Sequence, residues 1–245
     1  MNRTLAICKR ELAAYFGSPL AYTVTFFFLF LLGLFFFFGV FYQDVGWPFY
    51  LRKVASVDNM FNASQFLFLF LIPALTMRLF AEERRSGTLE LLTTLPVRDI
   101  EVVLGKYLAA LGYVLVVLAL TLVYPIYVST LGNLDWGAVT AGYVGLCLVG
   151  MGTLAIGVFA SALTPHQVVA FVVALGIALP FFFLHKVSFL FGAGAGNVLD
   201  FLAFRSHFDG IARGVLDSGD ILFFLGITTI FIFLAHRLLG GRRWR

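Results

Sequence analysis

Six long runs of apolar residues, almost free of charge, decide what this chain can fold into. They extend over residues 20–41, 62–81, 107–130, 138–163, 168–185 and 221–239. A helix needs about 20 apolar residues to cross roughly 30 Å of hydrocarbon, and each run approaches or exceeds that length. Only 12% of the residues are charged, whereas soluble domains carry about 25%. We therefore predict an all-α integral membrane protein with six transmembrane helices. The runs are continuous rather than alternating, which excludes a β-barrel.

The basic residues are distributed unequally between the two sides of such a membrane. Six crossings place both termini on the side that also carries the connection near residues 82–106. Twelve of the 17 Lys and Arg residues lie on that side: Arg3, Lys9, Arg10, Arg78, Arg84, Arg85, Arg98, Lys106, Arg237, Arg242, Arg243 and Arg245. The other five are Arg52, Lys53, Lys186, Arg205 and Arg213. By the positive-inside rule we expect both termini in the cytoplasm and a multi-pass protein of the plasma (inner) membrane.

The segment before the first run is predicted to lie along the membrane surface. Over residues 3–16, one helical face collects four residues: Leu5, Cys8, Leu12 and Phe16. The basic residues lie away from that face, where they can meet anionic headgroups. A frayed, solvated tail is the alternative. Within a single transmembrane domain of residues 1–245, we therefore assign residues 1–19 to an interfacial helix.

Motifs for catalysis and nucleotide binding are missing from the sequence. There is no HExxH helix and no GxSxG elbow. The Gly105–Lys106 pair lacks the upstream glycine and the following Ser or Thr of a phosphate-binding loop. We predict that the chain is not an enzyme and binds no cofactor, metal or nucleic acid. Any energy for active transport then comes from another subunit or from an ion gradient.

Two weaker patterns have competing interpretations. His207 and Asp209 are two potential metal ligands without further partners, and the alternative for the histidines is an interfacial or capping role. Small residues recur every four positions in the fourth and fifth runs, where they favour close packing of helices within one subunit, with packing between subunits as the alternative. They are Gly137, Ala141 and Gly145, then Thr153, Gly157 and Ser161, then Ala170, Ala174 and Ala178.

The densest polar stretch is residues 81–96, between the second and third runs. Two acids, Glu82 and Glu83, precede two bases, Arg84 and Arg85. Ser86 and Glu90 approach the spacing of a capping box, leucines recur at positions 89, 92 and 95, and a proline follows at position 96. We predict a bend at Gly87 and then a short amphipathic helix that docks on a soluble partner. A solvated loop with self-paired charges is the alternative.

At this stretch the sequence resembles a known family. Type-2 ABC exporter permeases share a signature that resembles the string EERRSGTLELLTTLPVRDIEVVLGK. The gliding-motility-type branch of that family resembles the chain at KRELAAYFGSPLAY and at RSHFDGIARGVLDSGDILFF followed by GGRRWR. The likeness covers most of the chain, and the motif after the second run is its most specific part.

The resemblance implies a permease that lies among the membrane lipids and has two kinds of protein partner. One is a pair of cytoplasmic ABC ATPase subunits, which use ATP and Mg. The other is a second permease copy or a homologous permease, with the first and fifth spans at the interface. A coupling helix in the cytoplasmic loop 82–106 contacts the ATPase, and the matching residues are Glu82, Glu83, Arg84, Arg85, Gly87, Thr88 and Glu90. The extracytoplasmic loop 186–220 contains short helices that re-enter the outer leaflet, with a plain loop as the alternative.

The substrate is hardly constrained by the sequence. The Phe-rich first run faces lipid and neighbouring helices, or it lines an apolar path for a lipid-linked or amphipathic substrate. Two other functions stay open: an ATP-driven mechanotransmission or regulatory complex that moves no substrate, and a membrane scaffold outside the ABC family.

Overall fold

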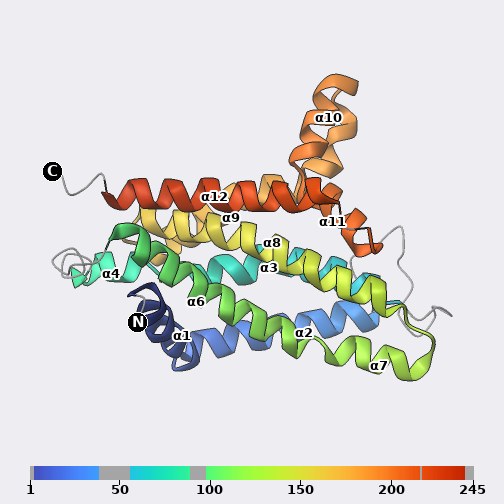
Figure 1. The fold of residues 1–245 in the computed structure, drawn as a ribbon, viewed down its shortest axis with the longest axis horizontal. Helices are drawn as coiled ribbons and strands as arrows, with labels where there is room; N and C mark the ends of the chain where they lie inside the picture. Colours follow the sequence, from blue (N-terminus) through green and yellow to red (C-terminus); the bar gives the residue numbers. More distant parts are fainter. Residues whose placement is uncertain (1–2, 39–55, 89–97, 216, 241–245) are drawn as a thin grey trace.

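The computed structural model describes residues 3–38, 56–88, 98–215 and 217–240. These residues form helices and no strand, and six of the helical segments are long and apolar enough to cross a membrane (Figure 1). The spans are α2 (Pro19–Phe38), α3 (Asp58–Thr76) with α4 (Ala81–Arg85), α6 (Asp99–Leu120) with α7 (Val123–Leu131), α8 (Trp136–Leu163), α9 (Gln167–Val187) and α12 (Ser218–Gly240). The all-α membrane fold predicted from the apolar runs is confirmed.

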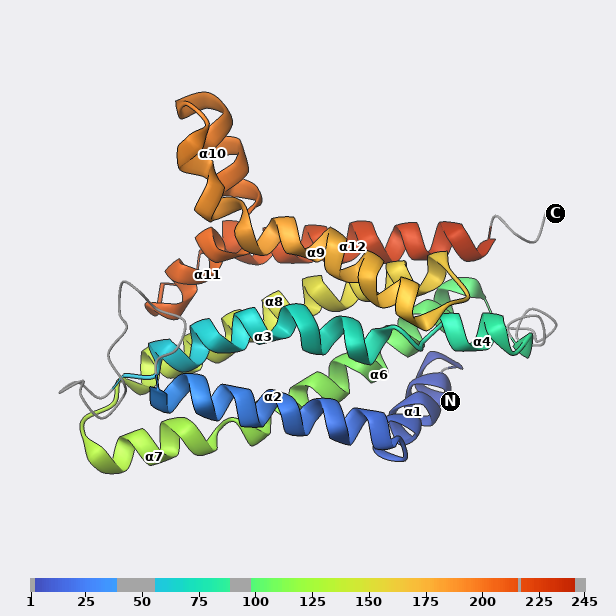
Figure 2. The same cartoon turned by 180° about the vertical axis from the view of Figure 1, so that it is seen from behind.

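The helices run side by side, so the bundle has two ends (Figures 1 and 2). One end, which we name the termini end, carries α1 (Arg3–Phe16), α4, the start of α6 and the end of α12. The other, the loop end, carries α7, α10 (Ala193–Leu202) and α11 (Phe204–Ala212). Residues far apart in the sequence therefore meet at each end.

The centre of the bundle is α8, which contacts α3, α6, α9, α11 and α12. Its glycines allow close approach: Gly145 lies against Phe208, and Gly157 lies against Thr76. A Cβ atom at either position would overlap the facing side chain. On α9 the small residues Ala170, Ala174 and Ala178 are buried. These small residues pack within the chain, whereas Gly137 is exposed at the start of α8.

The third span begins eight residues earlier than expected, at Asp99 rather than at Tyr107. Two acids explain the early start. The Glu101 carboxylate accepts a hydrogen bond from the Arg98 N–H at 2.9 Å, and Asp99 adds a negative charge to the first turn, where the helix dipole favours it. As a result, Lys106 lies two turns inside α6 and not in the connecting loop.

The segment before the last span is helical, as the resemblance implied, and not a plain loop. A 3₁₀ turn at Ser188–Leu190 leads into α10, which projects from the bundle (Figure 1). Helix α11 folds back against α8 and buries Phe204, Phe208 and Ile211. The apolar residues of this segment therefore divide between a projecting helix and a packed one.

Two histidines hold this segment to the neighbouring spans. His207 Nδ1 lies 2.6 Å from Asp220 Oδ1, while Asp209 pairs with Arg205 at 3.3 Å. His207 and Asp209 thus do not form the metal pair considered from the sequence. His185 Nδ1 lies 2.7 Å from Asp200 Oδ1, and this hydrogen bond lowers the pKa of Asp200. Both contacts fix the helices of the loop end.

Candidate site at the termini end

A break in the second span positions α4. Residues 77–80 leave the regular helix between α3 and α4, which frees backbone groups that need new partners. The Ser161 hydroxyl of α8 supplies them: it accepts hydrogen bonds from the N–H groups of Phe80 and Ala81, at 3.0 and 3.2 Å. It also donates to the carbonyl oxygen of Met77 at 3.1 Å. The start of α4 is thereby fixed to the centre of the bundle.

Hydroxyl groups and a glycine end α4. The Ser86 hydroxyl donates to the carbonyl oxygen of Glu82 at 2.9 Å and lies 2.8 Å from the Thr88 hydroxyl. Gly87 has a φ of 73°, a left-handed conformation that glycine adopts without strain. The predicted bend at Gly87 is present. Ser86 contacts the carbonyl side of α4, and its predicted capping partner Glu90 lies outside the described residues.

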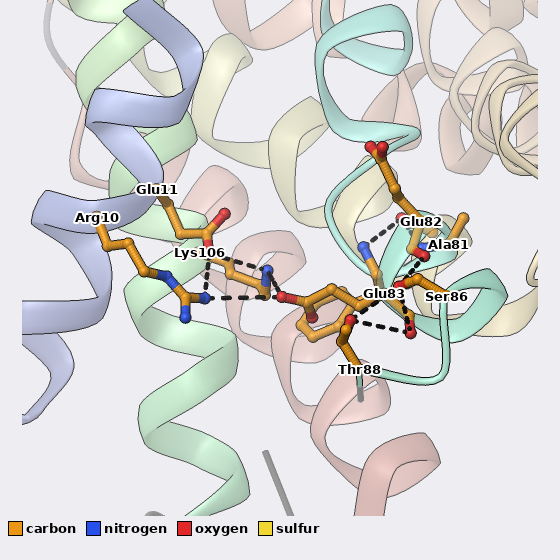
Figure 3. A network of polar contacts seen from close by, with 10 residues as sticks. Arg10, Glu11, Ala81, Glu82, Glu83, Ser86, Thr88 and Lys106 are labelled. Atoms are coloured by element: carbon orange, nitrogen blue, oxygen red, sulfur yellow. Dashed lines mark hydrogen bonds and ion pairs between the residues drawn. The ribbon is translucent and has the colours of Figure 1, made fainter. Parts of the chain in front are cut away.

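Lys106 lies at the centre of an ion-pair cluster that joins three helices (Figure 3). Its side chain is 1% exposed, and Nζ lies 2.8 Å from Glu83 Oε1 and 3.2 Å from Glu11 Oε1. Arg10 Nη2 lies 2.6 Å from Glu11 Oε1 and 3.7 Å from Glu83 Oε1. The Phe80 ring centroid is 5.3 Å from Lys106 Nζ, within the range of a cation–π contact. Two carboxylates and two cations from α1, α4 and α6 neutralise one another.

The cluster mechanically links α4 to α6 and α1. Removing one partner of a buried ion pair typically costs about 3–5 kcal/mol, because a buried charge is left uncompensated. If α4 moved alone, Lys106 would lose the Glu83 carboxylate in a buried environment. The hydrogen bond that Arg10 donates to the Glu11 carboxylate raises the pKa of Arg10 despite partial burial, so its guanidinium stays charged. A displacement of α4 must therefore move α6 and α1 with it or break the cluster.

A second layer of contacts ties α1, and the residue before α2, to the second and third spans. The Tyr15 hydroxyl donates to the Leu75 carbonyl oxygen at 3.1 Å, and its ring stacks on Tyr113 with centroids 5.2 Å apart. Burial raises the pKa of Tyr15, so the hydroxyl stays protonated. Arg78 Nη1 donates to Ser18 Oγ at 2.9 Å. A cavity of about 180 Å³ adjoins both layers, and its charged lining residues are Glu11, Arg78, Glu82, Glu83 and Lys106.

The predicted coupling residues have different surroundings. Four of them are exposed: Glu82, Arg85, Gly87 and Thr88. Glu83 faces Lys106, and Arg84 is half-buried. Glu90, like the leucines of the predicted amphipathic helix, lies outside the described residues. The exposed members form a surface at the termini end, and Glu83 connects that surface to the bundle.

Sequence reasoning missed Arg10, Glu11 and Lys106. It placed Lys106 in the connecting loop and left Glu11 out of the N-terminal pattern. A signal was nevertheless available, because a lone lysine within the apolar residues 102–108 needs an acidic partner when it is buried. Glu11 is the only acid among residues 1–16. Pairing these two residues in advance would have located the contact between α1 and α6.

The fold and the cluster together define a class of protein. In the part of the chain that the structure describes, six membrane-length helical segments run side by side, and charged residues of α1, α4 and α6 collect beside the break in the second span. This arrangement is that of a polytopic membrane protein with a buried ion-pair cluster at the termini end of its bundle.

The particular family follows from comparison with known sequences. A sequence model of the ABC-2 type transporter family matches residues 2–193, from α1 through the Lys106 cluster to the start of α10. The chain therefore belongs to the ABC-2 type transporter family. It is a permease component of an ABC transporter, without catalytic activity of its own. A comparison with curated proteins found no match.

Proposed function

We propose that the chain is the membrane subunit of an ABC exporter of the gliding-motility-type branch, driven by separate cytoplasmic ATPase subunits. These subunits dock on the loop of residues 82–106 and use ATP and Mg²⁺. The Lys106 cluster carries this proposal, because it joins the exposed surface of α4 to α1 and α6. The stretch beyond residue 193 supports the branch, through its likeness to that branch at residues 205–224.

The same proposal places the termini end in the cytoplasm at the inner membrane. Twelve of the 17 basic residues lie on that side of the predicted topology. Such an excess is typical of cytoplasmic loops. An ATPase in the cytoplasm would then meet Arg85 and Thr88, which are exposed at the end of α4.

In the proposed mechanism, closure of the ATPase pair displaces α4. The displacement acts on Lys106 through Glu83, and on the first two spans through the Tyr15 and Arg78 contacts. Packed cores and ion-pair clusters favour discrete arrangements over continuous deformation. ATP can bias the bundle only through contacts that differ between those arrangements. The Glu83–Lys106 pair is the contact that we expect to differ.

A second permease copy, or a homologous permease, is proposed to lie beside α2 and α9. Within the chain, only 17% of the apolar window of α9 and 28% of that of α2 are buried, against 78% for α8. These two spans therefore leave the largest outer surfaces together with α12, and family resemblance favours α2 and α9. Lipid covers whatever the partner does not.

Charge reversal on the exposed end of α4 tests the docking site. In Arg85→Glu, we expect the amount of copurified ATPase to fall about tenfold, because interfacial charges placed against like charges oppose association. The matched control is Arg213→Glu, which reverses an exposed arginine at the loop end. Equal ATPase recovery in the two variants would refute the docking assignment. ATP turnover by the intact complex without movement of any substrate would instead support the mechanotransmission alternative.

A further inference from the structure

A second cavity, of about 230 Å³, lies at the loop end, where α2, α3, α9 and α11 meet. Its polar lining residues are Asn62, Gln65, Lys186 and Arg205. Its apolar lining residues are Phe35, Ala63, Phe66, Phe182 and Phe183. None of these residues belongs to the Lys106 cluster or to the predicted docking loop. The cavity is therefore separate from the residues of the proposed ATPase contact.

The polar lining favours an anion. Lys186 and Arg205 are cations, and the lining contains no carboxylate from the residues that the structure describes. Asp209 pairs with the Arg205 Nε at 3.3 Å from outside the lining, whereas Lys186 has no ion pair within the part of the chain that the structure describes. The cavity therefore carries uncompensated positive charge.

Gln65 adds an independent observation. Its side chain is 6% exposed, and its Nε2 is buried with no hydrogen-bond partner among the described residues. Buried donors are nearly always paired in folded proteins, and an unpaired one is costly. An occupant that accepts hydrogen bonds would satisfy this amide. The amide donor of Gln65 and the two cations therefore favour the same kind of occupant, an anionic group that accepts hydrogen bonds.

The depth of the cavity indicates where its occupant comes from. Phe35 lies three residues before the end of α2, and Gln65 lies seven residues after the start of α3. At 1.5 Å per residue, the lining lies within about 11 Å of the helix ends. This is less than half of the roughly 30 Å of hydrocarbon, so one leaflet reaches the cavity. Lys186, at the end of α9, lies near headgroup level, and the four phenylalanine rings offer apolar contacts beside it.

We propose that this cavity binds an anionic amphiphile from the leaflet at the loop end. The anionic headgroup lies between Lys186 and Arg205 and accepts a hydrogen bond from Gln65, and the apolar chain lies along the phenylalanine rings. A free anion would leave the rings uncovered, and an uncharged lipid would leave Lys186 without an ion pair. Binding requires only membrane insertion. A role of this amphiphile as exported substrate rests on the proposed function, whereas the binding itself does not.

Native mass spectrometry of the purified chain tests the site without an ATPase. The probes are a short-chain phosphatidylglycerol, a phosphatidylcholine with the same chains, and inorganic phosphate. We expect phosphatidylglycerol to bind about tenfold more tightly than phosphatidylcholine, since hydrogen bonds to charged groups are the stronger ones. Lys186→Gln and Gln65→Leu should each weaken phosphatidylglycerol binding by about fivefold to tenfold. The control Arg237→Gln, at an exposed arginine near the end of α12, should leave it unchanged.

Four results would overturn the proposal. Equal affinity for the two lipids would remove the anion preference. Unchanged binding in Lys186→Gln would place the headgroup elsewhere, and this exposed side chain can be replaced without disturbing the core. Displacement of phosphatidylglycerol by inorganic phosphate at equal concentration would show a plain anion site. A folded Gln65→Leu variant that retains wild-type affinity would show that water, and not the amphiphile, satisfies the buried amide.

Discussion

Lys106 is seven residues inside α6, and its ammonium group contacts the carboxylates of Glu83 and Glu11. Neither acid is in the same helix as the lysine. A charge at this depth is tolerated because all members of the cluster are present together. At the residue scale, therefore, the attachment of α1 and α4 to the bundle depends on one buried cation and its partners.

Replacing this cation should destabilise the protein. For Lys106→Met, we expect a loss of about 3 kcal/mol in the free energy of unfolding, because the two carboxylates keep only Arg10 as a partner. The control Arg10→Gln removes a cation that is 58% exposed, and should cost about 0–1 kcal/mol. Denaturant unfolding in detergent measures both. Equal losses would contradict the buried-cluster account.

A double variant separates stability from coupling. Lys106→Met with Glu83→Leu replaces a buried ion pair by apolar side chains, which is often neutral or stabilising. We expect it to recover much of the stability lost in Lys106→Met, yet to leave ATP turnover independent of the permease. Recovery of coupling along with stability would show that the ion pair has only a structural role.

At the scale of the element, the contact between α1 and α6 depends on glycines in α6. Ile7 lies over Gly105, and Leu12 lies over Gly112. Leu5 and Phe16, which the helical pattern grouped with Leu12, remain exposed. These exposed residues can lie at the membrane interface, whereas the face that carries Ile7 packs against α6. Helix α1 thus has two apolar faces rather than one.

Adding one methyl group at the contact should loosen α1. In Gly105→Ala, the new Cβ would lie 2.7 Å from Ile7 Cγ2, and overpacking of this kind costs about 1–3 kcal/mol. Gly176→Ala is the matched control, because nothing lies within 4 Å of its new Cβ, and it should gain up to about 1 kcal/mol from helix propensity. Hydrogen exchange over residues 3–16 reports α1. Unchanged protection in Gly105→Ala would contradict the contact.

Local sequence patterns were sufficient to predict some elements of the structure but not others. The apolar runs predicted the six spans, and Gly87 predicted the bend, because span length and left-handed φ depend on nearby residues alone. The early start of α6 depends on Asp99 and Glu101, which lie before the apolar run and were therefore left out of the predicted span. The partners of Lys106 come from α1 and α4, and periodicity cannot report such contacts between helices. Similarly, the unpaired amide of Gln65 and the ammonium group of Lys186 line the same cavity only once the bundle has folded.

At the scale of the whole molecule, the two ends have different chemistry. The termini end has a neutral ion-pair cluster next to the exposed end of α4. The loop end has a cationic cavity with aromatic walls. We propose that the ATPase acts on the termini end and that an anionic amphiphile binds at the loop end.

The orientation can be tested with single cysteines. After Cys8 and Cys147 are replaced, Thr88→Cys and Arg213→Cys place one thiol at each end of the bundle, both at exposed positions. We expect a membrane-impermeant maleimide to label position 213 in intact cells or spheroplasts. Position 88 should react only after permeabilisation, because the excess of basic residues holds that side in the cytoplasm. The reverse labelling pattern would rule out the proposed orientation.

The proposed function requires a separate ATPase to contact this chain at the end of α4. A photo-crosslinking residue at position 85 tests it most directly, with the same residue at position 213 as the control. We predict that position 85 crosslinks to a protein whose peptides contain Walker motifs, and that position 213 does not. Absence of that crosslink from position 85 in an assembled, ATP-hydrolysing complex, or an equal crosslink from position 213, would contradict the account.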